Sequence, residues 1–123
     1  MRDILWGAAI AVAVMLIIHS ARSPSRRHGG PYPDPPQNAW FQEQAVGPSA
    51  AAPVVVKFGA EWCGPCRAME KQLDEVAQTF ASRVGIVRVD VDKHRDLAGH
   101  FDVSAIPHSF LMVDGKVVDD QVG

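Results

Sequence analysis

The sequence predicts an α/β domain with a central mixed sheet and flanking helices, preceded by one transmembrane helix. Two β-branched runs of strand length, at 54–58 and 86–91, are separated by a segment whose apolar residues recur every three or four positions, as in an amphipathic helix. Residues 108–122 form two further strand-like runs around an Asp-Gly pair, which is typical of a hairpin. The third observation is an almost wholly apolar run at residues 4–18.

Length and composition exclude several classes of protein. The 123 residues are enough for about one domain, so a multi-domain protein is excluded. Twelve basic and fourteen acidic side chains give a net charge of −2, and this lack of basic excess argues against nucleic acid as a partner. The only cysteines are Cys63 and Cys66, which excludes a disulfide-framework miniprotein and a four-cysteine zinc module within one chain.

The N-terminal residues 1–21 are predicted to be a transmembrane anchor or uncleaved signal. Residues 4–21 carry no formal charge and would rise about 27 Å as a helix, slightly less than the hydrocarbon core of a bilayer. A cleaved signal peptide is the alternative, but small residues are poorly placed for a cleavage site. We therefore expect the chain to contact a membrane through residues 4–21.

A proline-rich segment, residues 22–38, follows the predicted anchor. It contains five prolines and two glycines and has no hydrophobic period. Such a composition suits an extended spacer and a disordered segment equally well. The domain itself is then expected to occupy residues 39–123.

The elements of this domain are predicted in order. A short helix at 39–46 and a loop of small residues precede the first strand, 54–58, whose nearly continuous apolarity indicates burial on both faces. The next helix runs from the cysteines to Ala81, and the second strand, at 86–91, should pair with the first in parallel through this crossover. A short helix at 95–101 and the hairpin complete the domain. The apolar stripe of the long helix consists of Met69, Leu73, Val76, Ala77 and Phe80.

The cysteine pair lies in Trp62-Cys63-Gly64-Pro65-Cys66, where the first strand ends and the long helix begins. Unpaired backbone N–H groups and the helix dipole favour a thiolate at this position, so Cys63 is the expected nucleophile and Cys66 the resolving thiol. Gly64 allows close approach, Pro65 suits the first helical turn, and Trp62 would flank the site as a flat apolar surface.

Two other uses of the cysteine pair stay open at this point. It could be half of a metal site if the fold brought His94, His100 or His108 close, or it could be an inert structural pair.

The sequence EWCGPCR after the VVVKF strand, with the later run Val103–Pro107, resembles the thioredoxin family. The similarity covers about residues 39–123 and implies a thioredoxin-like fold that acts on protein disulfides or dithiols without a bound cofactor or metal. It also implies a cis peptide bond before Pro107, with Ile106 and Pro107 contacting the substrate, and a separate redox partner that recharges the dithiol.

Three residues depart from this family pattern. Lys57 stands where many thioredoxins have a buried aspartate, and Asp90 is a candidate partner for it. The lysine could act as a base if burial lowered its pKa, favour the Cys66 thiolate by its charge, or extend to the surface without a catalytic role. Lys71 replaces a common proline in the long helix, which could therefore run straighter. His108 replaces a threonine and is read either as a polar strand-edge residue or as a group that tunes the dithiol.

The resemblance also predicts a shortened fold, because the family would continue beyond Gly123 into a final helix. Without that helix we expect one face of the sheet, including residues of the strand 110–113, to be partly uncovered. A shortened protein, a truncated sequence and a fragment completed by another chain are all consistent with this expectation.

We therefore expect a membrane-tethered thiol-disulfide oxidoreductase that reduces protein disulfides through a mixed disulfide. The alternative is a non-catalytic, membrane-tethered interaction module or a fragment that needs a partner. Arg22, Arg26 and Arg27 after the anchor favour the cytoplasmic side, whereas tethered relatives generally work outside the cytoplasm. On balance we expect the extracytoplasmic, periplasmic side.

Overall fold

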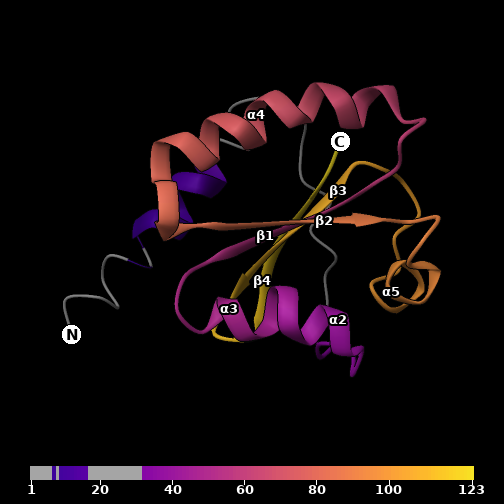
Figure 1. Cartoon of the computed structure of the whole chain (residues 1–123), viewed down its shortest axis with the longest axis horizontal. Helices are drawn as coiled ribbons and strands as arrows, with labels where there is room; N and C mark the ends of the chain where they lie inside the picture. The colour runs from indigo at the N-terminus through magenta and orange to yellow at the C-terminus, as the bar shows by residue number, and fades with distance from the viewer. Residues whose placement is uncertain (1–6, 8, 17–31) are drawn as a thin grey trace.

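The computed structural model of the chain describes residues 7, 9–16 and 32–123. Its centre is a four-stranded mixed sheet in the order β2-β1-β3-β4 (Figure 1). The strands are β1 (Val54–Gly59), β2 (Gly85–Asp90), β3 (His108–Val113) and β4 (Lys116–Val122). The predicted α/β domain with a mixed sheet is thus confirmed.

Strands β1 and β2 are parallel and are joined by the long helix α4 (Gly64–Phe80). The crossover is required because two parallel strands cannot be linked by a tight turn. Helix α4 runs without interruption past Lys71 and exposes that side chain. A 3₁₀ turn, η2 (Ala81–Arg83), then leads into β2.

Strands β3 and β4 form the predicted hairpin. Asp114 and Gly115 connect them with φ angles of 51° and 76°, which is the left-handed conformation that a two-residue hairpin turn needs. Strand β3 pairs antiparallel with both β1 and β4, and its pairing with β4 is irregular between Leu111 and Met112.

The face of the sheet that points away from α4, the lower face in Figure 1, is covered by short helices. These are α2 (Ala39–Phe41), the π-helical turn η1 (Gln42–Val46) and α3 (Gly47–Ser49), with α5 (Arg95–His100) near one end. Asn38 caps α2, because its side chain accepts a hydrogen bond from the N–H of Phe41 at 2.9 Å. The first helical stretch thus begins at the predicted residue but continues into the expected loop.

Aromatic rings dominate the core on this side, which we call the aromatic face. The rings of Phe58, Phe101 and Phe110 lie with centroids 5.1 to 5.6 Å apart, and Phe41 contacts Phe101. The strands contribute every second side chain to it, as a pleated sheet requires. Its buried apolar members are Phe41, Ala45, Val54, Val56, Phe58, Val89, Leu97, Phe101, Phe110, Met112 and Val117.

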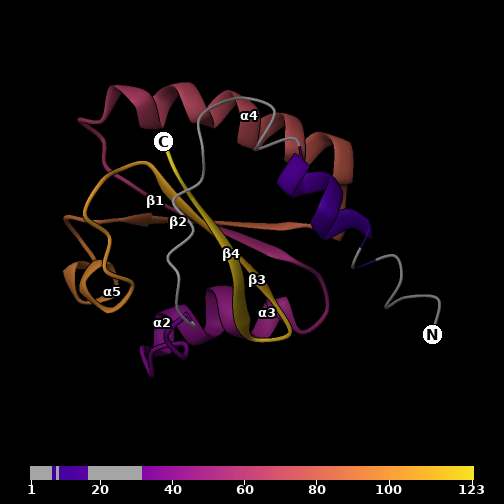
Figure 2. The same cartoon turned by 180° about the vertical axis from the view of Figure 1, so that it is seen from behind.

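The opposite face, which we call the α4 face, is covered by α4 together with the helical residues 9–16 (Figures 1 and 2). Ile10 and Val14 are 8% and 0% exposed. They belong to one apolar cluster with Val55, Met69, Leu73, Val76, Phe80, Val84 and Leu111. The alternation of β1 places Val55 and Lys57 on this face and Phe58 on the other.

The expectation of a partly uncovered strand 110–113 is wrong. Leu111 is only 5% exposed because Ile10 and Val14 pack in the same cluster, and Phe110 points into the aromatic face. An apolar segment distant in sequence thus covers the sheet, which removes the apolar surface from water.

Within the described residues, no helix has the length and hydrophobicity needed to cross a membrane. Most of the predicted anchor, residues 1–21, and the first part of the predicted spacer lie outside the described residues. The described part of that spacer contacts the domain: the Gln42 side chain donates to the carbonyl of Pro36 at 2.8 Å, and the Tyr32 hydroxyl donates to Asp120 at 2.9 Å.

Candidate functional site

The two cysteines lie at the N-terminus of α4. Strand β1 ends at Gly59, and Cys63 is the N-cap of the helix, with extended backbone angles of −87° and 107°. Its sulfur accepts a hydrogen bond from the backbone N–H of Cys66 at 3.2 Å, and Pro65 occupies the first turn, where its missing N–H leaves no bond unmade. The sulfur of Cys63 therefore lies where the helix end stabilises negative charge.

Cys63 and Cys66 form a disulfide, with Cα atoms 5.3 Å apart. Both residues are less than 5% exposed. Trp62 beside them is 69% exposed, and its indole N–H donates to Asp92 at 2.8 Å, which fixes the ring next to the cysteines. Trp62 is thus exposed beside the cysteines, and its partner Asp92 was not singled out from the sequence.

The peptide bond between Ile106 and Pro107 is cis, as the family resemblance implied. His108, the next residue, pairs with Phe58 in the β1–β3 register, one residue before Gly59. The cis bond therefore lies at the same end of the sheet as the loop that carries the cysteines. Pro107 is buried, whereas Ile106 is partly exposed.

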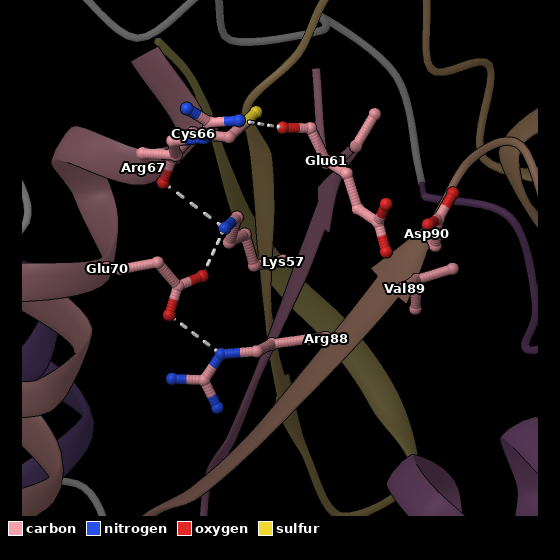
Figure 3. A pocket seen from close by; sticks show the side chains of 10 residues that line it. Lys57, Glu61, Cys66, Arg67, Glu70, Arg88, Val89 and Asp90 are labelled. Carbon is pink, nitrogen blue, oxygen red and sulfur yellow. Dashed lines mark hydrogen bonds and ion pairs between the residues drawn. The ribbon is translucent and has the colours of Figure 1, made fainter. Parts of the chain in front are cut away.

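A cavity of about 650 Å³ lies beside Cys66, between α4 and the ends of β1 and β2 (Figure 3). Lys57 projects into it from β1 and is 6% exposed. Its Nζ donates a hydrogen bond to the carbonyl oxygen of Cys66 at 3.3 Å and forms an ion pair with Glu70 Oε1. Lys57 thus does not extend to the surface, and Asp90 is not its partner in the structure.

Glu70 links Lys57 to a second cation. Its other oxygen, Oε2, accepts from Nε of Arg88 at 2.8 Å, and Nη2 of Arg88 lies 3.7 Å from Asp74. Burial by itself would raise the pKa of the Glu70 carboxyl, but the hydrogen bonds from Lys57 and Arg88 outweigh this and hold the pKa below its usual value. Glu70 is therefore a carboxylate at neutral pH.

Gly59 allows Lys57 and Cys66 to approach each other. A Cβ atom at this position would lie 3.0 Å from Cε of Lys57 and 3.2 Å from Sγ of Cys66. Both distances are shorter than ordinary carbon contacts, so a larger residue would push the lysine and the sulfur apart. The lysine side chain and the resolving sulfur thus flank the same glycine.

His108 occupies a different environment, on the aromatic face. Its Nε2 lies 2.7 Å from Asp120, whose other oxygen accepts the bond from Tyr32, and its ring stacks on Phe110. The hydrogen bond to Asp120 and burial raise the pKa of the Tyr32 phenol, burial having the larger effect. His108 is 3% exposed and is therefore not a strand-edge residue in contact with solvent.

The three histidines considered as metal ligands do not gather at the cysteines. His94 stacks on Trp40, His100 bonds to the carbonyl oxygen of Asp34, and His108 pairs with Asp120. No group of three or more potential ligands occurs in the part of the chain that the structure describes.

Glu70 and Arg88 also escaped the sequence analysis. Glu70 follows Cys66 by four residues, so helical spacing alone places both on one face of α4. Arg88 is directly opposite Lys57 in the parallel register of β1 and β2, and such a register between distant segments is not a local property of the sequence.

A mixed sheet with a CxxC pair between its first strand and the following helix, and a cis proline at the same sheet end, defines the thioredoxin-fold class. A sequence model of the thioredoxin family matches residues 36–123. The chain belongs to the thioredoxin family.

Individual relatives agree with this assignment. Mitochondrial thioredoxin of Bos taurus is 42% identical over 83 residues, which cover 68% of this chain and 49% of that protein. Thioredoxin 1 of Synechococcus elongatus is 35% identical over 70% of this chain and 78% of its own length. The crystal structure of Fasciola hepatica thioredoxin superposes with a TM-score of 0.62 at 33% identity, covering 69% of this chain and 81% of that one. The chain thus spans about half the length of the mammalian mitochondrial thioredoxins it matches.

Proposed function

We propose that the protein is a thiol-disulfide oxidoreductase that reduces disulfide bonds in protein substrates. The observation that carries this proposal is the Cys63–Cys66 disulfide at the N-terminus of α4, with the Cys63 sulfur accepting a backbone hydrogen bond. A cysteine thiol at that position has a lower pKa than a free cysteine. A larger fraction of it is therefore thiolate near neutral pH, which makes it a better nucleophile and leaving group.

The reaction has two balanced steps. In the reduced protein the Cys63 thiolate attacks one sulfur of a substrate disulfide, forms a mixed disulfide and releases the other substrate sulfur as a thiolate. Cys66 then loses its proton to solvent, and its thiolate attacks the Cys63 sulfur, which expels the second substrate thiolate. The substrate gains two electrons and two protons, and the protein is left with the disulfide seen in the structure. A separate reductant then returns the pair to the dithiol.

The neighbouring residues have supporting roles in this proposal. The partly exposed Ile106 and the cis Pro107 would pair with the substrate backbone, and the exposed Trp62 would cover its apolar side chains. Apart from the adjoining chain, no atom lies within 4 Å of the place where a Cβ of residue Gly64 would be, so the substrate can approach there. The Gly64-Pro65 dipeptide and Ile106 resemble those of reducing relatives, which favours disulfide reduction over disulfide formation.

Trapping the mixed disulfide tests the function. Cys66→Ser removes the resolving thiol, so a disulfide-containing peptide should stay covalently bound to Cys63 on a non-reducing gel. Cys63→Ser is the matched control and should trap nothing. A non-catalytic interaction module, the alternative, predicts that neither variant accumulates the adduct, and that outcome would refute the oxidoreductase proposal.

We further propose that residues 4–21 attach the protein to a membrane and that the domain lies on the extracytoplasmic side. The described helix 9–16 supports the attachment, because it is apolar on two sides. Ile10 and Val14 face the sheet, while Val12 and Leu16 are 59% and 64% exposed. A helix that is apolar all round suits a buried or a membrane environment.

Ile10 and Val14 cannot cover the sheet while residues 4–21 span a bilayer, so in this proposal the cover described above belongs to the chain outside a membrane. After expression in bacteria, a spanning anchor should keep the full chain in the membrane pellet at alkaline pH, and protease added to spheroplasts should digest the domain. Extraction of the intact chain into the alkaline supernatant would refute the anchor. Digestion only after lysis would place the domain in the cytoplasm.

A further inference from the structure

The cavity beside Cys66 contains a charged network that the exchange reaction as described does not use. It comprises Lys57 on β1, Glu70 on α4 and Arg88 on β2 (Figure 3). We propose that Glu70 is a positioning residue that keeps Lys57 protonated and in place beside Cys66, so that its ammonium group stabilises the Cys66 thiolate. This inference rests on the proposed exchange function and concerns its second step, in which the Cys66 thiolate resolves the mixed disulfide.

Lys57 lies beside the resolving cysteine. Its Nζ donates to the carbonyl oxygen of Cys66, and its Cε and the Cys66 sulfur flank the same missing Cβ of Gly59. The cation is therefore close to the atom that becomes negatively charged when the resolving thiol ionises. A cation within about 4–6 Å of an acidic group favours its charged form.

Burying the charge of a lysine costs free energy unless a counter-ion is present. Lys57 is 6% exposed, and an ammonium group without a counter-ion in such a place would lose its proton or move to solvent. Glu70 supplies the counter-ion. The Glu70 side chain itself is 34% exposed and is held ionised by Arg88, whose side chain is 48% exposed. A solvated ion pair on the rim thus supports the buried charge.

The charged groups around Lys57 are arranged in a row. Nζ of Lys57 lies between the carbonyl oxygen of Cys66 and Glu70 Oε1, and the Glu70 carboxylate in turn lies between two cations, Lys57 and Arg88. The other charged groups around the cavity are Arg67, Glu61 and Asp90, with Asp74 beyond Arg88. Arg67 donates to the Glu61 backbone carbonyl, and Asp90 accepts from the N–H of Asp92. Among the residues that the structure describes, Lys57 is thus the cation whose side chain donates to the resolving cysteine.

In this scheme Lys57 is not the proton acceptor. The ammonium group stays protonated while the Cys66 thiol releases its proton to solvent in the cavity, and its charge lowers the free energy of the resulting thiolate. The bond changes of the second step are those already given. Removal of Lys57 should therefore slow the resolving step at neutral pH without preventing formation of the mixed disulfide.

A titration that does not depend on catalysis tests the assignment. In full-length Cys63→Ser, Cys66 is the only cysteine, so absorbance at 240 nm measures its ionisation directly. Tyr32 is the only tyrosine, and its raised pKa keeps the absorbance of its phenolate out of the pH range in which Cys66 is titrated. In this background Lys57→Met, with Lys57→Gln as a second neutral replacement, should move the pH midpoint of Cys66 upward by about one unit, a tenfold loss of thiolate at fixed pH.

Glu70→Gln separates positioning from direct electrostatics. If Glu70 acts through Lys57, its loss moves the midpoint upward as well, and the Lys57→Met/Glu70→Gln double variant moves it no further than Lys57→Met. If Glu70 acts only through its own negative charge, the midpoint moves downward. A downward or additive shift would overturn the proposal, as would an unchanged midpoint in both Lys57 variants.

Glu75→Gln is the matched control, because it removes the same charge from an exposed position of the same helix. It should leave the midpoint unchanged. Circular dichroism of every variant checks that the domain is folded. Failure of the trapping experiment with Cys66→Ser would refute the exchange function and leave this titration interpretable, so the two proposals fail separately.

Discussion

The two faces of the sheet each contain a buried polar cluster, but they connect it to solvent differently. On the aromatic face, His108 and Asp120 are 3% and 2% exposed and are covered by Tyr32 and aromatic rings. On the α4 face, Lys57 is equally buried, but its partners Glu70 and Arg88 reach the surface beside the cavity at Cys66. A hydrogen-bonded pair that is closed off from solvent supports the fold, whereas a charged network that reaches both solvent and a cysteine can also influence chemistry.

The same difference applies to the apolar cover. The aromatic face is closed by helices adjacent in sequence to the strands they cover, while the α4 face depends on α4 and on the distant residues 9–16. Mutations should therefore weaken the aromatic face through packing, and the α4 face through loss of its cover or of its charges.

Phe58→Ala should have the largest effect. Phe58 is fully buried against Phe101 and Phe110, and truncation of such a residue typically lowers the free energy of unfolding by about 3–5 kcal/mol. Chemical denaturation of the full chain measures this change. Val118→Ala, at a half-exposed apolar position on β4, is the control and should change it by less than about 0.5 kcal/mol. Equal losses in the two variants would show that the aromatic face is not the main core.

Val14→Asp tests the cover of the α4 face. A carboxylate cannot stay buried there without a partner, so helix 9–16 should leave the sheet and the free energy of unfolding should fall by about 2 kcal/mol, the value of the lost apolar burial. Leu16→Asp, at an exposed position of the same helix, should have little effect in detergent-free buffer. Similar losses in both variants would mean that Val14 does not face the sheet in solution.

Asp120→Asn tests the closed polar cluster of His108, Asp120 and Tyr32. The amide keeps the shape of the side chain but replaces one of its two acceptor oxygens by an NH2 donor, so either His108 or Tyr32 loses its acceptor and we expect the free energy of unfolding to fall by about 1–3 kcal/mol. In the Cys63→Ser background the same change should leave the pH midpoint of Cys66 unaltered. A shift as large as that of Lys57→Met would show that the two faces are coupled.

Glu70 should give the smallest effect, and it depends on pH. Its pKa in the folded protein lies below that of the unfolded chain, so the carboxylate stabilises the fold above the unfolded value near 4.3, and this contribution is lost as the pH falls through the folded pKa. The difference in denaturation midpoint between the native chain and Glu70→Gln should therefore shrink between pH 6 and pH 3. Because the Glu70 side chain is a third exposed, we expect this pH-dependent contribution to the free energy of unfolding to be less than about 1 kcal/mol. A difference that grows on acidification would contradict this sign.

Local sequence patterns were enough for the strands, the long helix, the hairpin and the roles expected of Cys63 and Cys66. Each depends on residues close together in the chain: the β-branched run of β1, the helical spacing of α4, the turn residues and the CxxC motif. The cis bond before Pro107 followed from the family resemblance. Glu70 was within reach of the same reasoning, because it lies one helical turn after Cys66.

Contacts between distant segments could not be read in this way. The sequence determined that Lys57 lies on a buried strand and that residues 9–16 are apolar. Only the tertiary structure decided that Glu70, not Asp90, pairs with Lys57, that His108 is closed off by Asp120 and Tyr32, and that Ile10 and Val14 cover the sheet. The physical reason is that periodicity fixes which face a side chain occupies, whereas the register of the strands and the docking of helices fix which group it meets there.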